Sequence, residues 1–325
     1  MNKSKPVISF LFRYSRLIIL LLVFLIFTIF TDTFFNFSDF ANFTKSNIYN
    51  IIAQQVPFLI ILSIGMTIAI ILKGIDLSMG TVLALSSCLA ALVLKATGSV
   101  ILCLVVGLTI GLLFGLANGV LIAKVGLSPY ISTYTIQWVS RGIAYVVLAG
   151  TQVFDFPLAF RNLFIGWEYT LIMIAIIVAV ILWFVMSKSN FGRSLYMVGS
   201  NREAAQLSGI NTSKVITISF SIIGVLAALA GLMYIANLGA AEPVIGANFP
   251  IRAIAATLIG GASFGGGKGS VVNSIIGVFI MIILENGLLH MNVHSNWQEF
   301  AIGIAIVLSI ILEKVGQKAL AENKA

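Results

Sequence analysis

Residues 188–214 read KSNFGRSLYMVGSNREAAQLSGINTSK, and this polar stretch separates two strongly apolar runs, Tyr169–Met186 and Val215–Ala236. Each run is close to the roughly 20 residues that an α-helix needs to cross a bilayer. Lipid offers no hydrogen-bond partners, so continuous apolar runs cross it as helices. The stretch and its flanks therefore predict an all-α membrane protein with a polar connection between two spans.

A short helix over Asn201–Ser208 is predicted inside this stretch. Ser200 and Glu203 have the S-x-x-E spacing of a capping box, in which each side chain binds a free backbone N–H. Gly209 suits the left-handed position that ends a helix. A helix capped at both ends indicates a rigid docking surface for a soluble partner, and a solvated connecting loop is the alternative.

The composition excludes a soluble globular protein. Of 325 residues, 59% are hydrophobic and 9% are charged, whereas soluble domains carry about 25% charged residues. The net charge is +8, and its basic residues lie mainly between apolar runs. The positive-inside rule explains this placement, so we expect no nucleic-acid partner.

The apolar runs predict about ten transmembrane or partly spanning helices in a single membrane domain over residues 1–325. Basic residues before the first run place the N-terminus in the cytoplasm, and we expect a retained first span rather than a signal peptide. The predicted cytoplasmic segments are residues 1–16, 188–214 and 313–325, so both termini are cytoplasmic. The predicted spans lie within Leu17–Thr31, Asn47–Leu72, Ser78–Leu94, Ala96–Ala123, Pro129–Leu148, Tyr169–Met186, Val215–Ala236, Ala253–Gly261, Val271–Leu289 and Trp297–Leu312.

Three of these segments carry further signals. The eighth is too short to cross, which predicts a half-length helix beside a cavity and leaves eight or nine full crossings as alternatives. The fourth has Gly107, Gly111, Gly115 and Gly119 on one face, where a neighbouring backbone can approach closely. Asp76 precedes the third and is expected to cap it.

The chemistry of an enzyme is missing from the sequence. Cys88, Cys103, His290 and His294 show no metal-ligand or disulfide spacing. The glycine-rich segment 265–270 fails the P-loop pattern at two required positions. We therefore expect no catalytic residue, no metal and no cofactor in this chain, and a membrane-embedded enzyme is a weak hypothesis.

Polar residues at membrane depth are candidates for a transport path, because such groups face a bundle interior or water. Arg141 and Glu285 both fall in the outer half of a predicted span, so one hypothesis is that the two charges pair. The alternative is that each meets water separately. The candidate path residues are Gln54, Gln55, Asn118, Thr133, Gln137, Arg141, Glu285 and Asn286.

Several stretches together resemble the permease subunits of bacterial ATP-driven monosaccharide importers, the ribose, xylose and autoinducer-sugar group. The specific parts are FGRSLYMVGSNREAAQLSGIN at residues 191–211, AIAATLIGGAS at 253–263 and GGGKGS at 265–270. GIDLSMG at 74–80, NGVLIAK at 118–124 and the Arg141-Gly142 pair within 129–150 add to them. The resemblance covers nearly the whole chain.

This resemblance implies a bacterial inner-membrane pore of two permease subunits, the same or related. Two cytoplasmic subunits bind ATP and drive it, and an extracytoplasmic binding protein delivers the sugar. The short helix is implied to be the coupling element that seats in a cleft of the ATPase. The residues so assigned are Ser200, Asn201, Arg202, Glu203, Ala204, Ala205, Leu207, Ser208 and Gly209.

Departures from the family pattern leave the identity of the sugar open. They are the YISTYT run at residues 130–135, Arg252 in place of an acidic residue, and the Glu285-Asn286 pair in place of a neutral one. A secondary sugar transporter that uses an ion gradient and needs no ATPase remains the alternative function.

Overall fold

The chain is a bundle of helices with one two-stranded pairing, in a computed structural model that describes residues 4–31, 34–35 and 47–322. The predicted all-α class is confirmed. Within the described residues, six helices are long and apolar enough to cross a membrane. Whether the other predicted spans cross, and whether both termini are cytoplasmic, stay predictions. Residues 1–3 and 323–325 of the predicted cytoplasmic ends lie outside the described part of the chain.

The core is built around α4 (Val56–Ile71), whose 16 residues are all buried. A helix that is apolar on every side is stable only when other elements surround it. Here α9 (Thr170–Lys188), α12 (Thr212–Leu238), α13 (Phe249–Ile259) and α14 (Val271–His290) pack around it. The short α3 (Asn47–Asn50) and the π-helical turn η2 (Ile51–Gln55) lead directly into α4, so the predicted second span is one helix with a π-bulge.

The glycine ladder of the fourth predicted span is confirmed. It lies on α6 (Val100–Val120), which ends in the π-helical turn η3 (Leu121–Val125). A Cβ at Gly111 would meet the backbone of Gly224, and one at Gly115 would meet the carbonyl of Phe220. Both contacts are with α12, so the two backbones approach as closely as the glycines allow.

Two more helices complete this side of the bundle. α5 (Met79–Thr97) packs against α6 and α12, and α7 (Pro129–Leu148) packs against α5. After α7 the chain forms β1 (Val153–Phe154) and α8 (Leu158–Ile165), in the connection between the fifth and sixth predicted spans. β1 pairs antiparallel with β2 (Ala240–Ala241), which follows α12.

The predicted half-length helix is also confirmed. α13 has 11 residues, or about 16 Å at 1.5 Å per residue, which is about half of a hydrocarbon core. It packs on α14, where a Cβ at Gly277 would meet the carbonyl of Ala256. α1 (Ser4–Phe30) lies against α14, and α15 (Ser295–Glu322) lies against α13 and α14.

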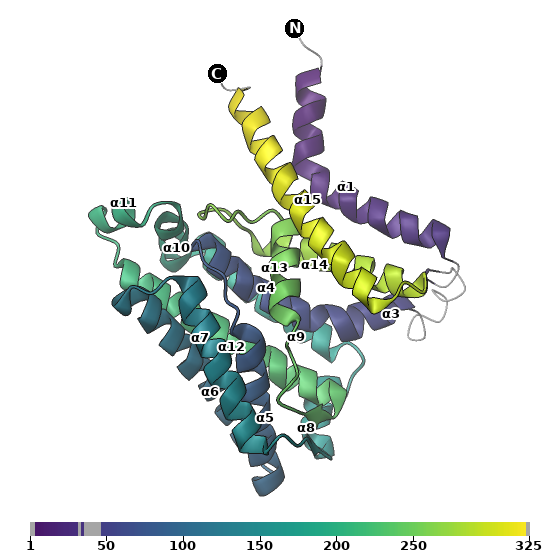
Figure 1. The fold of residues 1–325 in the computed structure, drawn as a ribbon, viewed down its shortest axis with the longest axis vertical. Helices are drawn as coiled ribbons and strands as arrows, with labels where there is room; N and C mark the ends of the chain where they lie inside the picture. The colour runs from purple at the N-terminus through teal and green to yellow at the C-terminus, as the bar shows by residue number, and fades with distance from the viewer. Residues whose placement is uncertain (1–3, 32–33, 36–46, 323–325) are drawn as a thin grey trace.

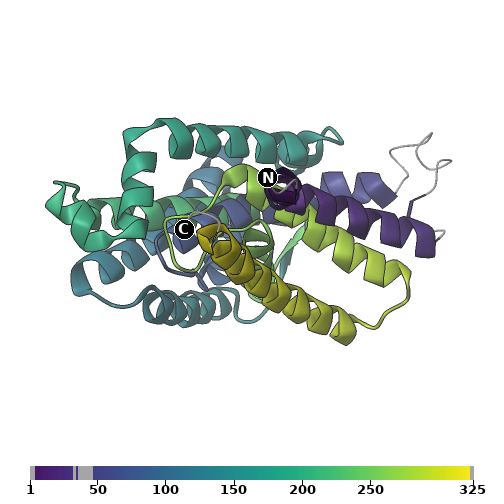
Figure 2. The ribbon, with the colours of Figure 1, turned by 90° about the horizontal axis from the view of Figure 1, so that it is seen from above.

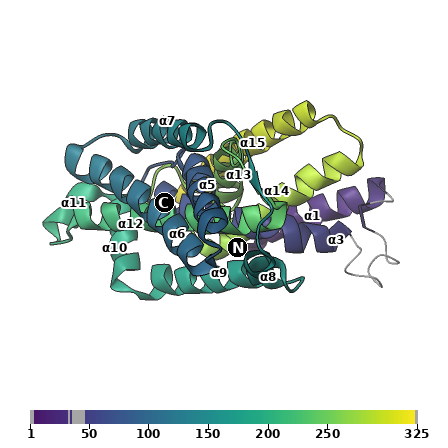
Figure 3. The same ribbon diagram turned by 90° about the horizontal axis from the view of Figure 1, so that it is seen from below.

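The figures place these elements relative to one another. The start of α1 and the end of α15 lie at the top of Figure 1, α10 (Asn190–Ser200) and α11 (Arg202–Leu207) lie at its upper left, and α8 lies at the bottom. Seen from above, the two ends lie near the middle of the bundle (Figure 2). Figure 3 shows α7 and α9 on opposite flanks, with the core helices between them.

Candidate functional site

The predicted short helix exists as α11, and its N-terminal cap is one residue later than expected. Asn201, in an extended conformation, accepts a hydrogen bond at its side-chain oxygen from the backbone N–H of Ala204 at 3.0 Å. Ser200 instead closes α10, so the Ser200–Glu203 capping box is wrong. Asn is as good an N-cap as Ser, and Glu203 still places a negative charge in the first turn, near the positive end of the helix.

The predicted C-terminal cap at Gly209 is confirmed. Gly209 has φ +84°, a conformation that favours glycine. Its N–H donates to the Gln206 carbonyl at 3.0 Å, and the N–H of Ile210 donates to the Ala205 carbonyl at 3.1 Å. These two bonds form a Schellman motif. Both ends of α11 are therefore fixed by local hydrogen bonds.

The assigned coupling residues lie mostly on the surface. Leu207 is 91% exposed, and Ala205 is buried against the bundle. The others are exposed, namely Ser200, Asn201, Arg202, Glu203, Ala204, Ser208 and Gly209. A leucine so fully exposed on a rigid helix is an apolar anchor that no other described residue of this chain covers.

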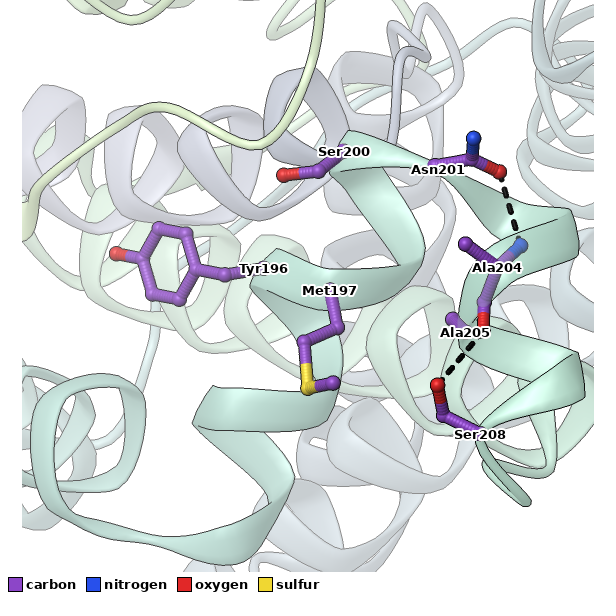
Figure 4. Close-up of a pocket in the computed structure, with 7 residues that line it drawn as sticks. All are labelled: Tyr196, Met197, Ser200, Asn201, Ala204, Ala205 and Ser208. Atoms are coloured by element: carbon purple, nitrogen blue, oxygen red, sulfur yellow. Dashed lines mark hydrogen bonds between the residues drawn. The ribbon is translucent and has the colours of Figure 1, made fainter.

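Beside this anchor, α10 and α11 enclose a cleft of about 310 Å³. Figure 4 shows Tyr196, Met197 and Ser200 on the α10 side and Ala204, Ala205 and Ser208 on the α11 side. Helix α10 was not predicted from the sequence, although this amphipathic helix forms one wall of the cleft. We refer to α10 and α11 together as the knob.

The knob is fastened to the end of α4. Gly199 packs directly on the carbonyl oxygen of Ile71, and Lys73 donates to the carbonyl of Ser200 at 3.0 Å. The same Ile71 carbonyl accepts from the N–H of Gly267 at 2.9 Å, and Tyr196 donates to the Gly269 carbonyl at 2.8 Å. The glycine-rich segment thus joins the knob to α4 at close range.

Further hydrogen bonds join α4 to the half-length helix and its neighbour. Thr257 on α13 donates to the carbonyl of Ser63 at 3.1 Å. The hydroxyls of Thr67 and Ser274 lie 2.6 Å apart, between α4 and α14. All four residues are buried, and buried hydrogen bonds hold helices in one register. These bonds tie α4 to α13 and α14.

The hypothesis that Arg141 pairs with Glu285 is wrong. Glu285 faces Arg252 of α13, with 3.2 Å between Oε1 and Nε and without hydrogen-bond geometry. Arg141 donates to the carbonyls of Pro243 and Ile245 in the segment before α13. Irregular backbone within a membrane protein needs such partners. The sequence placed Arg141 and Glu285 at a similar depth in the membrane, but depth alone does not identify their partners. Those partners come from α13 and from the loop before it.

Asn118 and Thr133 belong to a polar network at the start of α7. Asn118 donates to the Ser78 hydroxyl at 2.9 Å and accepts from Ser132 at 3.0 Å. Asp76 accepts from the N–H and hydroxyl of Ser78 at 2.8 and 2.6 Å. Asp76 therefore orders the turn before α5, whereas Ser78 is the N-cap residue of that helix. Thr133 donates to the Ile75 carbonyl at 3.2 Å.

The other candidate path residues lie apart from this network. Gln54 and Gln55 are exposed on the π-bulge η2, a feature often found at functional sites. Asn286 is buried and accepts from Asn47 at 2.9 Å. Gln137 is half-buried on α7. The structure thus does not gather the eight candidates into one cluster.

Comparisons with known proteins give the family of this chain. Residues 47–310 match the family described as branched-chain amino acid transport system / permease component. The ribose import permease protein of Escherichia coli is 34% identical over 282 residues, which cover 84% of this chain and 87% of that protein. The corresponding Bacillus subtilis protein is 36% identical, with 82% and 84% covered.

A D-allose transport system permease protein of Escherichia coli is also 36% identical, with 85% of each chain covered. No solved structure matches this chain. The family match covers most of the chain and agrees with the apolar helices found in the structure. The chain therefore belongs to the family of membrane permease components that includes the sugar permeases of ABC transporters.

Proposed function

We propose that this chain is the permease subunit of an ATP-driven importer that moves a monosaccharide, or a similar small polar sugar, into the cytoplasm. A separate cytoplasmic subunit binds and hydrolyses ATP, so this chain carries no cofactor and no catalytic residue. An extracytoplasmic binding protein delivers the sugar, and a second permease subunit completes the pore. The complex lies in the bacterial inner membrane, with both termini of this chain in the cytoplasm.

The knob is the observation that carries this proposal. Its helix α11 is capped at both ends, presents Leu207 at 91% exposure and stands beside a cleft of about 310 Å³. A soluble subunit can bury Leu207, which is worth about 1.5–3 kcal/mol when fully buried. This exposed anchor favours an importer with a soluble partner over a secondary transporter that works alone.

The contacts of the knob support a mechanism for coupling. Rearrangement of the ATPase subunits displaces α11, and the packing of Gly199 on Ile71 transmits the displacement to α4. The Ser63–Thr257 and Thr67–Ser274 hydrogen bonds then carry it to α13 and α14. The Arg252–Glu285 ion pair joins the same two helices. ATP hydrolysis outside the membrane thereby shifts the elements beside the sugar path.

The test compares two exposed leucines. Leu207→Ser removes the proposed anchor, and Leu158→Ser on α8, a residue that is 72% exposed, is the matched control. With the partner ATPase co-expressed, Leu207→Ser is expected to weaken its co-purification and lower ATP-dependent sugar uptake by about tenfold. The control should retain both.

Sugar uptake by proteoliposomes distinguishes the ATP-driven importer from a secondary transporter. Vesicles that contain this chain, its ATPase and its binding protein should take up sugar only when ATP is supplied on the side of the membrane that carries the ATPase. Uptake by this chain alone, driven by a proton or sodium gradient, would instead establish a secondary transporter.

A further inference from the structure

One face of α1 lies against the bundle over about three turns of helix. Phe27 is buried on this face, and a Cβ at Gly287 of α14 would meet its ring. Leu20 and Phe24 pack against the core on the same side. Arg16 precedes Phe27 by eleven residues, which places it about 20° away around the helix at about 100° per residue. The inward face therefore also carries Arg16, which is half-buried.

The guanidinium of Arg16 lies against the backbone that ends α13. A Cβ at Gly261 would meet the Nη2, Cζ and Nε atoms of Arg16. Gly261 has φ +83° and donates its N–H to the Leu258 carbonyl at 2.7 Å, and the N–H of Ala262 donates to the Thr257 carbonyl at 3.1 Å. These two bonds form a Schellman motif. Position 261 thus requires glycine both for its conformation and for the space that Arg16 fills.

The charge of Arg16 complements this helix end. The C-terminus of a helix carries a partial negative charge of about half an electron, and a cation placed there is stabilising. The last turn of α13 contains no basic residue, so α1 supplies the cation that α13 lacks. Arg16 therefore links α1 to the half-length helix.

A role in membrane topology alone does not explain this placement. Basic residues that only follow the positive-inside rule extend into water at the end of a span. Lys124, in the last turn of η3, is exposed in this way. Arg16 instead lies on protein backbone, where its planar guanidinium covers a residue without a side chain. This contact points to a role within the protein.

The segment 261–267 runs from Arg16 to the knob. A Cβ at Gly266 would meet the carbonyl oxygen of Gly199 on α10, and Figure 1 shows this light green segment beside α10. The N–H of Gly266 also donates to the Ser263 carbonyl at 2.9 Å, so the segment is an ordered turn rather than a slack linker. Arg16 and the knob therefore contact opposite ends of one short, ordered segment.

We propose that Arg16 is a positioning residue of the transport cycle, which holds the C-terminal end of α13 against α1 and must release it before α13 can move. This inference rests on the proposed function, in which the ATPase displaces the knob. That displacement pulls on segment 261–267, and Arg16 resists it until the loaded binding protein has docked on the other side of the membrane. Without Arg16, α13 moves before sugar has been delivered, so ATP is hydrolysed without transport.

A double-mutant cycle tests the contact. Gly261→Ala adds a Cβ against Arg16, and Gly126→Ala is the matched control, because Gly126 also has φ +83° but nothing lies within 4 Å of its Cβ. Gly261→Ala should lower the melting temperature in detergent more than Gly126→Ala does. Arg16→Ala should cancel part of this extra loss, because it frees the space. Losses that simply add in the double variant would overturn the contact.

ATP turnover tests the role of Arg16. Proteoliposomes that contain the full complex are assayed for ATP hydrolysis and sugar uptake, with and without the binding protein. Arg16→Gln should raise hydrolysis without the binding protein about two- to fivefold, as expected for the loss of a cation at a helix C-terminus, and should lower the amount of sugar moved per ATP. Arg16→Lys keeps the charge and should retain most of the native ratio. Lys124→Gln, which removes an exposed cation, should retain it fully.

The outcomes separate this inference from the proposed function. If the native complex takes up sugar with ATP, an unchanged ratio in Arg16→Gln would overturn only the role of Arg16. Hydrolysis and uptake that fall together in Arg16→Gln, in step with a lower melting temperature, would show that the residue only stabilises the fold and would also overturn that role. A native complex that takes up no sugar with ATP would overturn the proposed function itself, and the role of Arg16 with it.

Discussion

Gly199 of α10 packs directly on the carbonyl oxygen of Ile71, the last residue of α4. The same oxygen accepts a hydrogen bond from Gly267. One backbone atom therefore joins the knob, the central helix and the glycine-rich segment. This contact leaves no space for a side chain at residue 199.

Gly199→Ala should separate the knob from α4, because the added Cβ would overlap the Ile71 carbonyl. Overpacking of this kind costs about 1–3 kcal/mol, and we expect a lower melting temperature in detergent and reduced stimulation of the ATPase. Gly303→Ala is the matched control, since nothing lies within 4 Å of its Cβ. Equal ATPase stimulation in both variants would show that the contact does not transmit coupling.

Substitutions at Gly209 test the backbone conformation alone, because a side chain there would contact nothing. Its φ is +84° and its Cβ position is open, so only backbone strain opposes substitution. Gly209→Val should distort the end of α11 and reduce uptake several-fold, while Gly209→Asn should retain most activity because Asn tolerates the left-handed region. Membrane abundance, measured by immunoblot, should be normal for both. Equal uptake by Val and Asn variants would remove the need for a fixed α11 terminus.

Gly115→Leu should prevent α6 from packing on α12, where a Cβ would meet the Phe220 carbonyl. The two backbones must then move apart, and we expect low abundance and a lower melting temperature. Leu113→Ala on the exposed face of the same helix, where Leu113 is 53% exposed, should change little. Comparable abundance of the two variants would contradict the observed packing.

Asp76 should make stability depend on pH. It lies outside the six spanning candidates, and burial raises its pKa to about 6 from 3.8, although the hydrogen bonds from Ser78 act in the opposite direction. The folded state therefore binds the Asp76 proton more tightly than the unfolded state does. The stability that this proton contributes is complete below about pH 4 and is lost as the pH rises through 6. Asp76→Asn keeps a side-chain oxygen that can accept the Ser78 hydrogen bonds, but its amide does not titrate.

The check on Asp76 is the melting temperature in detergent between pH 4 and pH 7. The native protein should lose more stability across this range than Asp76→Asn does. Parallel curves for the two proteins would mean that Asp76 does not govern the dependence.

Arg252 and Glu285 should depend on one another. Glu285 is 14% exposed and Arg252 is 40% exposed, so loss of the arginine leaves a mostly buried carboxylate without its counter-charge. Arg252→Gln should reduce uptake more than the double variant Arg252→Gln, Glu285→Gln. Arg141→Gln, combined with Glu285→Gln, is the control, and its effects should add. Additive losses for Arg252 and Glu285 would contradict their pairing.

Much of the fold could be predicted because its signals are local. The length of an apolar run gives a helix, the four-residue glycine spacing gives one face, and a run as short as Ala253–Gly261 gives a half-length helix. The C-terminal cap at Gly209 is likewise a property of one residue. These features need no knowledge of what lies nearby in space.

The site was less predictable because its contacts join distant segments. The π-bulge, α8 and α10 have weak local signals, and Asn201 competed with Ser200 for the same capping role. The partners of Arg141 and Glu285 depend on where the segment before α13 folds. Helix length and depth cannot supply that position.

The glycine seam between α6 and α12 holds these two helices together as one rigid unit. With Gly111 against Gly224 and Gly115 against Phe220, a slide of one residue, about 1.5 Å, would drive a side chain into the facing backbone. This pair therefore stays fixed through a transport cycle. Each turnover must be completed by elements attached through hydrogen bonds and ion pairs, which can exchange partners without reopening the seam.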